Sequence, residues 1–124
     1  MSNPTLIRNF KAEAAVPAFT VVKSGAADGQ VLAGAAASDK LIGISTDIAA
    51  AINERCDVIL SGAADTLYGG AVARGDLVTV DASGRIVTAA PAAGINNRII
   101  GVALVSGVLG DVGSVQISQG MLQG

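Results

Sequence analysis

The chain repeats one series of short apolar segments at an offset of about 57 residues. The three matched pairs are Ala15-Val16 with Ala71-Val72, Leu41-Ile42-Gly43-Ile44 with Ile99-Ile100-Gly101-Val102, and Val58-Ile59-Leu60 with Val115-Gln116-Ile117. Because the pairs keep their order as well as their spacing, they indicate a duplicated supersecondary unit. The sequence therefore predicts two quasi-repeated halves, approximately residues 15–62 and 71–120, within one domain.

Each half shows short strands separated by turns. Phe19 to Lys23 and Leu77 to Val80 are apolar or β-branched runs, and a turn rich in Asp and Gly follows each of them. In the second of these turns, Gly84 is expected to take a positive φ. Strands of this length and spacing are typical of a sandwich or small barrel. We therefore predict an all-β fold, a compact β-barrel or sandwich, for residues 15–124.

One stretch of the first half is ambiguous. In the stretch from Ser45 to Asp57, the residues Ile48, Ile52 and Cys56 are spaced four apart, a spacing that is typical of one face of a short helix. Its counterpart, Ala103 to Gly113, contains three glycines and is a poor helix former. A loop, with at most one helical turn, is therefore favoured.

Residues 1–14 stand outside this repeat. The segment is polar at first and then mixes apolar with charged side chains, so it is predicted to be a first strand or an arm that reaches a neighbouring molecule. Phe10 is one of only two Phe residues in the chain, and buried aromatic side chains commonly anchor interfaces. The candidate contacts with a partner protein or another subunit are Leu6, Ile7, Arg8 and Phe10.

The composition favours a protein that associates. Hydrophobic residues make up 51% of the chain and charged residues 15%, against roughly 25% charged in an average globular protein. Other copies or another protein would cover the excess apolar surface, and a well-packed, Ala-rich monomer is the alternative. The longest uncharged apolar stretch, Ile99 to Gly110, is too short and too rich in glycine for a membrane span. No signal peptide is visible, so synthesis in a cytoplasm is expected.

Charge and residue types also limit the chemistry. The net charge is −2 and the eight basic residues are scattered singly, so no nucleic-acid partner is predicted. The chain has no histidine, and its single cysteine, Cys56, is expected to be a buried filler. Asp65 with Asp76, or Glu54 with Asp57, could pair across a cleft, but no pattern favours either pair. We predict no enzyme, cofactor or metal site.

Two quasi-equivalent halves also occur in lipoyl and biotinyl carrier domains, which present a modifiable lysine at a hairpin tip. Neither the turn at Asp28-Gly29 nor the turn from Asp81 to Gly84 contains a lysine, so this interpretation fails. A small non-catalytic, carbohydrate- or ligand-binding β module is a further alternative. It is poorly supported because the chain has only three aromatic residues for stacking.

The segments of this chain, taken together and in order, resemble those of a known protein family. These segments include Asn3-Pro4-Thr5-Leu6-Ile7, Phe19-Thr20-Val21-Val22-Lys23, Tyr68-Gly69-Gly70, Arg74-Gly75-Asp76-Leu77, Pro91-Ala92-Ala93-Gly94 and Gly113-Ser114-Val115. Over essentially the full length, the series resembles the capsid cement, or head decoration, proteins of tailed bacteriophages. The resemblance implies a non-catalytic virion protein with a β-tulip fold. Such a protein would be made in the host cytoplasm and would bind the major capsid protein as a homotrimer at local three-fold positions on the outer head surface.

Overall fold

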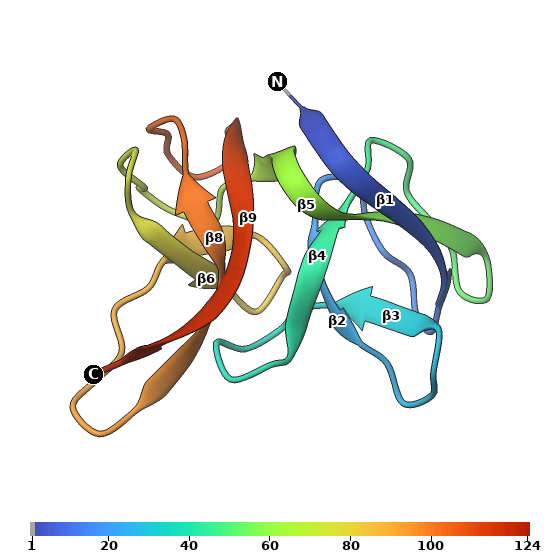
Figure 1. The fold of residues 1–124 in the computed structure, drawn as a ribbon, viewed down its shortest axis with the longest axis horizontal. Coiled ribbons are helices and arrows are strands. Elements are labelled where there is room, and N and C mark those ends of the chain that lie inside the picture. Colours follow the sequence, from blue (N-terminus) through green and yellow to red (C-terminus); the bar gives the residue numbers. More distant parts are fainter. Residues whose placement is uncertain (1) are drawn as a thin grey trace.

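The computed structural model describes residues 2–124, and within them the chain forms nine strands and no helix (Figure 1). The strands are β1 (Asn3–Ala12), β2 (Val21–Ser24), β3 (Gln30–Ala33), β4 (Leu41–Ser45), β5 (Arg55–Leu67), β6 (Leu77–Val80), β7 (Ile86–Thr88), β8 (Asn96–Ala103) and β9 (Val112–Gln123). They form one sheet in the order β1-β3-β2-β4-β5-β9-β8-β6-β7. The predicted all-β fold of two quasi-repeated halves is confirmed.

The first five strands close into a ring, here called ring 1. β1 pairs with β5 in antiparallel orientation and with β3 in parallel orientation, the latter only at Lys11 and Ala12. The antiparallel pairs β3–β2, β2–β4 and β4–β5 complete the circuit. Residues 3–10 of β1 thus pair on one side only, so β1 is an edge strand over most of its length.

The remaining strands close a second ring, ring 2, in the same manner. The end of β5, from Gly62 to Leu67, pairs with β9, and β8, β6 and β7 follow. Tyr68, directly after β5, forms a parallel bridge to Ile86 of β7 and closes this ring. The 13 residues of β5 therefore belong to both rings, and Figure 1 shows the strand running across the molecule between them.

The backbone places the N-terminal strand inside the repeat, although sequence comparison left residues 1–14 outside it. β1 pairs with the start of β5 as the end of β5 pairs with β9: Phe10 faces Cys56, and Thr66 faces Gly113. β1 and the end of β5 are thus equivalent strands. The sequences do not reveal this equivalence, because β1 contains Pro4 and polar residues whereas the end of β5 contains small residues. Met1, part of the predicted N-terminal segment, lies outside the described residues.

The ambiguous stretch between β4 and β5 is a loop over residues 46–54, as favoured from its sequence. The predicted turn after β6 also forms, with Gly84 at φ 76°. Strands β5 and β9 are longer than the segments Val58 to Leu60 and Val115 to Ile117 that mark them in the sequence. About half of the extra residues are Ser, Gly, Gln or Ala, which pair through the backbone without an apolar pattern that would mark a strand.

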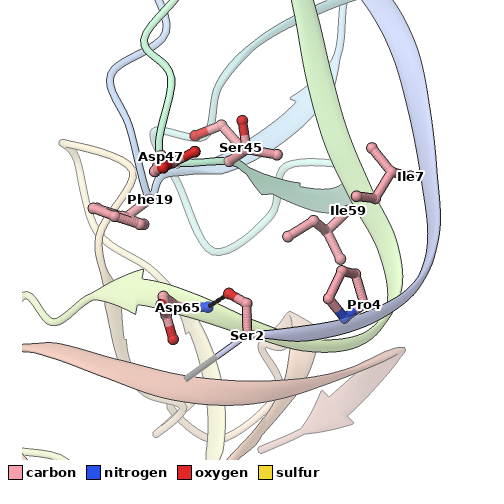
Figure 2. Close-up of a pocket in the computed structure, with 9 residues that line it drawn as sticks. Ser2, Pro4, Ile7, Phe19, Ser45, Asp47, Ile59 and Asp65 are labelled. Carbon is pink, nitrogen blue, oxygen red and sulfur yellow. Dashed lines mark hydrogen bonds between the residues drawn. The ribbon is translucent and has the colours of Figure 1, made fainter.

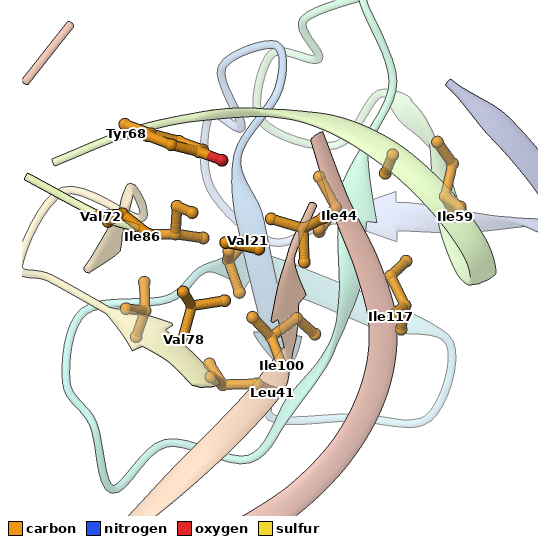
Figure 3. Packing of buried hydrophobic residues seen from close by; sticks show 14 residues of the cluster. Val21, Leu41, Ile44, Ile59, Tyr68, Val72, Val78, Ile86, Ile100 and Ile117 are labelled. Carbon is orange, nitrogen blue, oxygen red and sulfur yellow. The ribbon is translucent and has the colours of Figure 1, made fainter. Parts of the chain in front are cut away.

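Two clusters of buried side chains fill the two rings. The smaller cluster takes residues from β1, β2, β3 and β5 and from two loops of ring 1, and side chains of β1, β4 and β5 pack against it. Its members are Ala12, Val16, Val22, Val31, Ala50, Cys56 and Val58, with Phe10, Ile42 and Leu60 packed against them. The larger cluster fills ring 2 and continues to Val21, Leu41, Ile44 and Ile59 of ring 1 (Figure 3). The outer face of ring 1 therefore packs on ring 2, and the two rings share one apolar boundary.

A large side chain in ring 2 replaces several small ones in ring 1. The Tyr68 ring is fully buried and lies against Gly107 and Gly113, and a Cβ added at Gly107 would lie 2.7 Å from it. By strand register and bridge, Tyr68, Gly107 and Gly113 occupy the positions that Ala12, Ala50 and Cys56 occupy in ring 1. One large side chain beside two glycines thus replaces three small side chains, an exchange of similar total volume that protein interiors tolerate.

We expect Gly113→Ala to lower the free energy of unfolding by about 2 to 3 kcal/mol, because the added methyl group must displace the Tyr68 ring. Gly120→Ala on the same strand is the matched control, since nothing lies within 4 Å of its added Cβ. Urea unfolding followed by circular dichroism measures both. In a Tyr68→Leu background, Gly113→Ala should cost less than half as much; an equal cost in both backgrounds would contradict this role for the ring.

Candidate functional site

The candidate contact residues all lie on β1, and the structure gives them different surroundings. Leu6 and Ile7 are 52% and 47% exposed, and Arg8 is exposed as well. Phe10 is half-buried and packs against the core of ring 1. The guanidinium carbon of Arg8 lies 5.6 Å from the centroid of the Phe10 ring, a cation–π arrangement. Phe10 therefore supports the strand from within, whereas Leu6, Ile7 and Arg8 face outward.

The β1–β5 pairing has two adjacent irregularities at Leu6 and Ile7, both of which are exposed. The register shifts between Pro4 and Leu6 and again between Leu6 and Ile7. In a regular strand neighbouring side chains point to opposite faces, and a bulge re-aims them. Gly62 lies opposite with φ 92°, and a Cβ there would come within 2.6 Å of the Asn3 carbonyl oxygen. Only glycine fits that position without moving β1.

A pocket of about 310 Å³ opens beside Ile7. Its lining combines apolar and polar side chains: Ser2, Pro4, Ile7, Phe19, Ser45, Thr46, Asp47, Ile59 and Asp65. Figure 2 shows Ile7, Ile59 and Pro4 on one side, with Phe19 and Asp47 across from them. At the base of this view the backbone N–H of Asp65 donates a hydrogen bond to Ser2 Oγ at 2.8 Å. The pocket is large enough for one or two side chains of a partner.

Phe19 forms one wall of this pocket under backbone strain. Its φ is 56°, a left-handed conformation that is uncommon for a bulky residue. Backbone hydrogen bonds hold it: Phe19 N donates to Thr46 O at 3.1 Å, and Leu67 N donates to Phe19 O at 3.0 Å. The equivalent residue of ring 2 is Gly75, with φ 91°. In the repeat, Phe19 therefore aligns with a glycine. This mismatch was the one feature of the sequence that could have indicated the pocket, and the sequence-based predictions did not include it.

The carboxylates proposed as alternative pairs serve local structure instead. Each accepts a hydrogen bond at 2.7 to 3.1 Å within its own turn or strand pair: Glu54 from Ala51 N, Asp57 from Asn9 Nδ2, and Asp76 from Ala73 N and Thr88 Oγ1. Asp65 lines the pocket on β5. Among residues 2–124, no group of three or more His, Cys, Asp and Glu is placed to hold a metal ion.

Cys56 is buried, and this burial, with the Asp57 charge adding to it, raises the pKa of its thiol. A higher pKa leaves less thiolate, the form that reacts as a nucleophile. The described part of the chain contains no helix that is long and apolar enough to cross a membrane.

Comparisons with known proteins define the fold more closely than the sequence does. No protein-family model matches the chain, and no curated protein matches its sequence. Among solved structures, the chain is similar to one described as the crystal structure of head fiber gp8.5 N base in bacteriophage phi29. The TM-score is 0.68 at 15% identity, and the match covers 96% of this chain and 98% of that one. The two chains therefore share one fold over nearly their full lengths.

Truncating β1 side chains should separate support of the fold from surface contact. We expect Phe10→Ala to lower the free energy of unfolding by about 2 kcal/mol, because the ring packs on the core of ring 1. Leu6→Ala should change it by less than about 0.5 kcal/mol, because that side chain is exposed. Urea unfolding of both variants is the measurement. Equal losses would contradict the division of roles along β1.

Proposed function

We propose that this chain is a structural protein of a phage virion, which binds the outer surface of the head and stabilises the capsid lattice. The proposed partner is the major capsid protein, and the proposed position is the local three-fold, where the chain acts as a homotrimer. The observation that supports this most is the nearly end-to-end fold match with the N base of a phage head fiber. The sequence resemblance to capsid cement proteins points in the same direction.

The surface composition supports a binding role. Among residues 2–124, twelve large hydrophobic side chains are exposed, including Leu6 and Ile7 on β1. β1 also has an unpaired backbone edge over residues 3–10, beside a pocket that could receive a partner side chain. Many copies on a repeating shell would bind firmly even through small contacts, because attachment at one point raises the effective concentration at the next.

The proposed role requires neither catalysis nor a cofactor. Glu54, Asp57 and Asp76 are used in turns and strand pairs, and the one thiol is buried with a raised pKa. General acid–base chemistry would instead need a pair of groups placed together for proton transfer. We therefore propose that the chain acts through its surfaces.

The pocket beside β1 supports a second candidate function, a small ligand- or carbohydrate-binding module on a phage fibre or surface assembly. Phe19 stands in its wall and could stack on a sugar ring, with Asp47 and Asp65 as polar neighbours. A glycan array would discriminate between the two. Specific sugar binding that is lost in Phe19→Ala favours the module, and a blank array favours the capsid role.

Electron microscopy of matured heads that lack the protein tests the proposed function. Adding the purified chain should produce new density at the local three-fold positions. Leu6→Asp should reduce occupancy at least about tenfold, because a charge replaces an exposed apolar contact on β1. Met121→Asp, at a similarly exposed site on β9, is the control and should bind normally. Heads that gain no density from the unaltered chain would contradict the proposal.

A further inference from the structure

The two rings carry the same loop at the same place. Loop A, residues 46–54, joins β4 to β5, and loop B, residues 104–111, joins β8 to β9. Loop A is bridged through Ala50 to Val16, and loop B through Gly107 to Val72. Each ends in one tight turn with a positive φ, at Asn53 in loop A and Gly110 in loop B.

A matching carboxylate closes each turn. Glu54 accepts a hydrogen bond from Ala51 N at 2.7 Å, and Asp111 accepts one from Val108 N at 2.9 Å. From the bridged residue to the closing carboxylate the two loops are therefore equivalent residue by residue, and loop A has one residue more before its bridge.

Both loops expose aliphatic side chains at the same two positions. Ile48 and Ile52 of loop A are 70% and 61% exposed, and their equivalents Val105 and Leu109 of loop B are 43% and 61% exposed. Loop B also exposes Leu104 and Val108. Exposed apolar groups that are gathered on one loop mark contact sites more often than scattered ones do. Here the same apolar positions are presented twice by one chain.

The loops present these side chains on a rigid backbone. In loop B the buried Tyr68 hydroxyl donates to Val105 O at 2.6 Å, and Gly110 N donates to Tyr68 O at 2.9 Å. Burial raises the pKa of Tyr68, so the hydroxyl keeps its proton near neutral pH. In loop A, Asn53 N donates to Ala12 O at 2.8 Å. A surface that is already ordered loses little conformational entropy when it binds.

The charges beside the two loops are opposite. Loop A carries the exposed Asp47 next to Ile48, at the position that Leu104 occupies in loop B. Loop B lies against the exposed Arg74, whose backbone N–H donates to Ser106 Oγ at 3.0 Å. Neither Asp47 nor Arg74 forms an ion pair with another residue in the described part of the chain. The two loops are thus alike in apolar character, each has one carboxylate in its closing turn, and the further charges beside them, Asp47 and Arg74, are opposite in sign.

We propose that loop A of one copy packs against loop B of the next copy. The contact sets Ile48 and Ile52 against Val105 and Leu109, with Asp47 facing Arg74. A contact of loop A with loop A would bring two Asp47 side chains together, and loop B with loop B would bring together two Arg74 side chains, so like charges disfavour both. A head-to-tail contact of this kind closes a ring when its rotation allows.

The placement of the loops fits this contact. Figure 1 shows loop A beyond β4 on the side of ring 1, and loop B above β8 on the side of ring 2. The two surfaces therefore lie on different sides of one chain and are free to meet different neighbours. The inference rests on the proposed homotrimer, for which three such contacts would complete the ring.

Cysteine cross-linking tests the contact directly. A chain with Ile52→Cys is mixed with a chain with Leu109→Cys and treated with a short bis-maleimide. We expect a covalent dimer from the mixture and only background from either chain alone. A chain with both substitutions should give covalent species that end at three copies. The unaltered chain, whose Cys56 is buried, sets the background, and Ile95→Cys in place of Leu109→Cys is the matched control at an exposed site outside loop B.

A charge exchange gives a second readout. Asp47→Arg alone or Arg74→Asp alone should weaken self-association at least about tenfold in sedimentation equilibrium, and the double variant should recover most of it. Asp28→Arg, in the exposed turn before β3, should have no such effect.

Two results would overturn the loop contact. One is cross-linking of Ile52→Cys to itself, which would show that loop A meets its own counterpart. The other is the absence of the mixed product, both for the free chain and in the presence of matured heads. If the chain forms trimers without the mixed product, the loop contact is refuted and the capsid role is unaffected. If heads gain no density, the capsid role is refuted and the cross-linking result still stands.

Discussion

The fold depends on the pairing of β5 with different neighbours along its length. The start of β5 pairs with β1 and β4 in ring 1, and its end pairs with β9 in ring 2. Gly62, with φ 92°, lies where the pairing with β9 begins. Because one strand cannot shift its register in one ring without shifting it in the other, the two rings are held in a fixed relation. The shared apolar boundary from Val21 to Ile59 depends on that relation.

Divergence between the rings has altered surfaces more than the framework. The large Tyr68 against two glycines in ring 2 takes the place of three smaller residues in ring 1, and the ring closure is the same. Elsewhere the same framework carries different side chains: Phe19 where ring 2 has Gly75, and Asp47 where it has Leu104. Phe19 and Asp47 line the pocket of ring 1, and a more apolar loop stands in ring 2. One duplicated scaffold can in this way offer two different contact surfaces.

Much of the framework could be predicted from the sequence, because paired apolar runs and Gly turns signal strands locally. The turn at Gly84 and the Ile-Gly strands are examples. The place of β1 could not be predicted, since it follows from backbone pairing with β5 and Pro4 and the polar residues obscure the pattern. The contact role of the β1 residues stays a prediction: Leu6, Ile7 and Arg8 are exposed, whereas Phe10 packs inside its own ring. The pocket was missed because its walls come together only in the folded chain.

The proposed role on a shell requires a chain that resists local opening, and β5 provides this resistance if it joins the rings into one cooperative unit. Native-state hydrogen exchange on the β5 amides measures this most directly. We expect residues 55–60 and 63–67 to exchange with the same free energy and the same dependence on urea, because both require opening of the whole chain. Exchange of residues 55–60 at a distinctly lower free energy than residues 63–67 would show that ring 1 opens alone and would contradict the account.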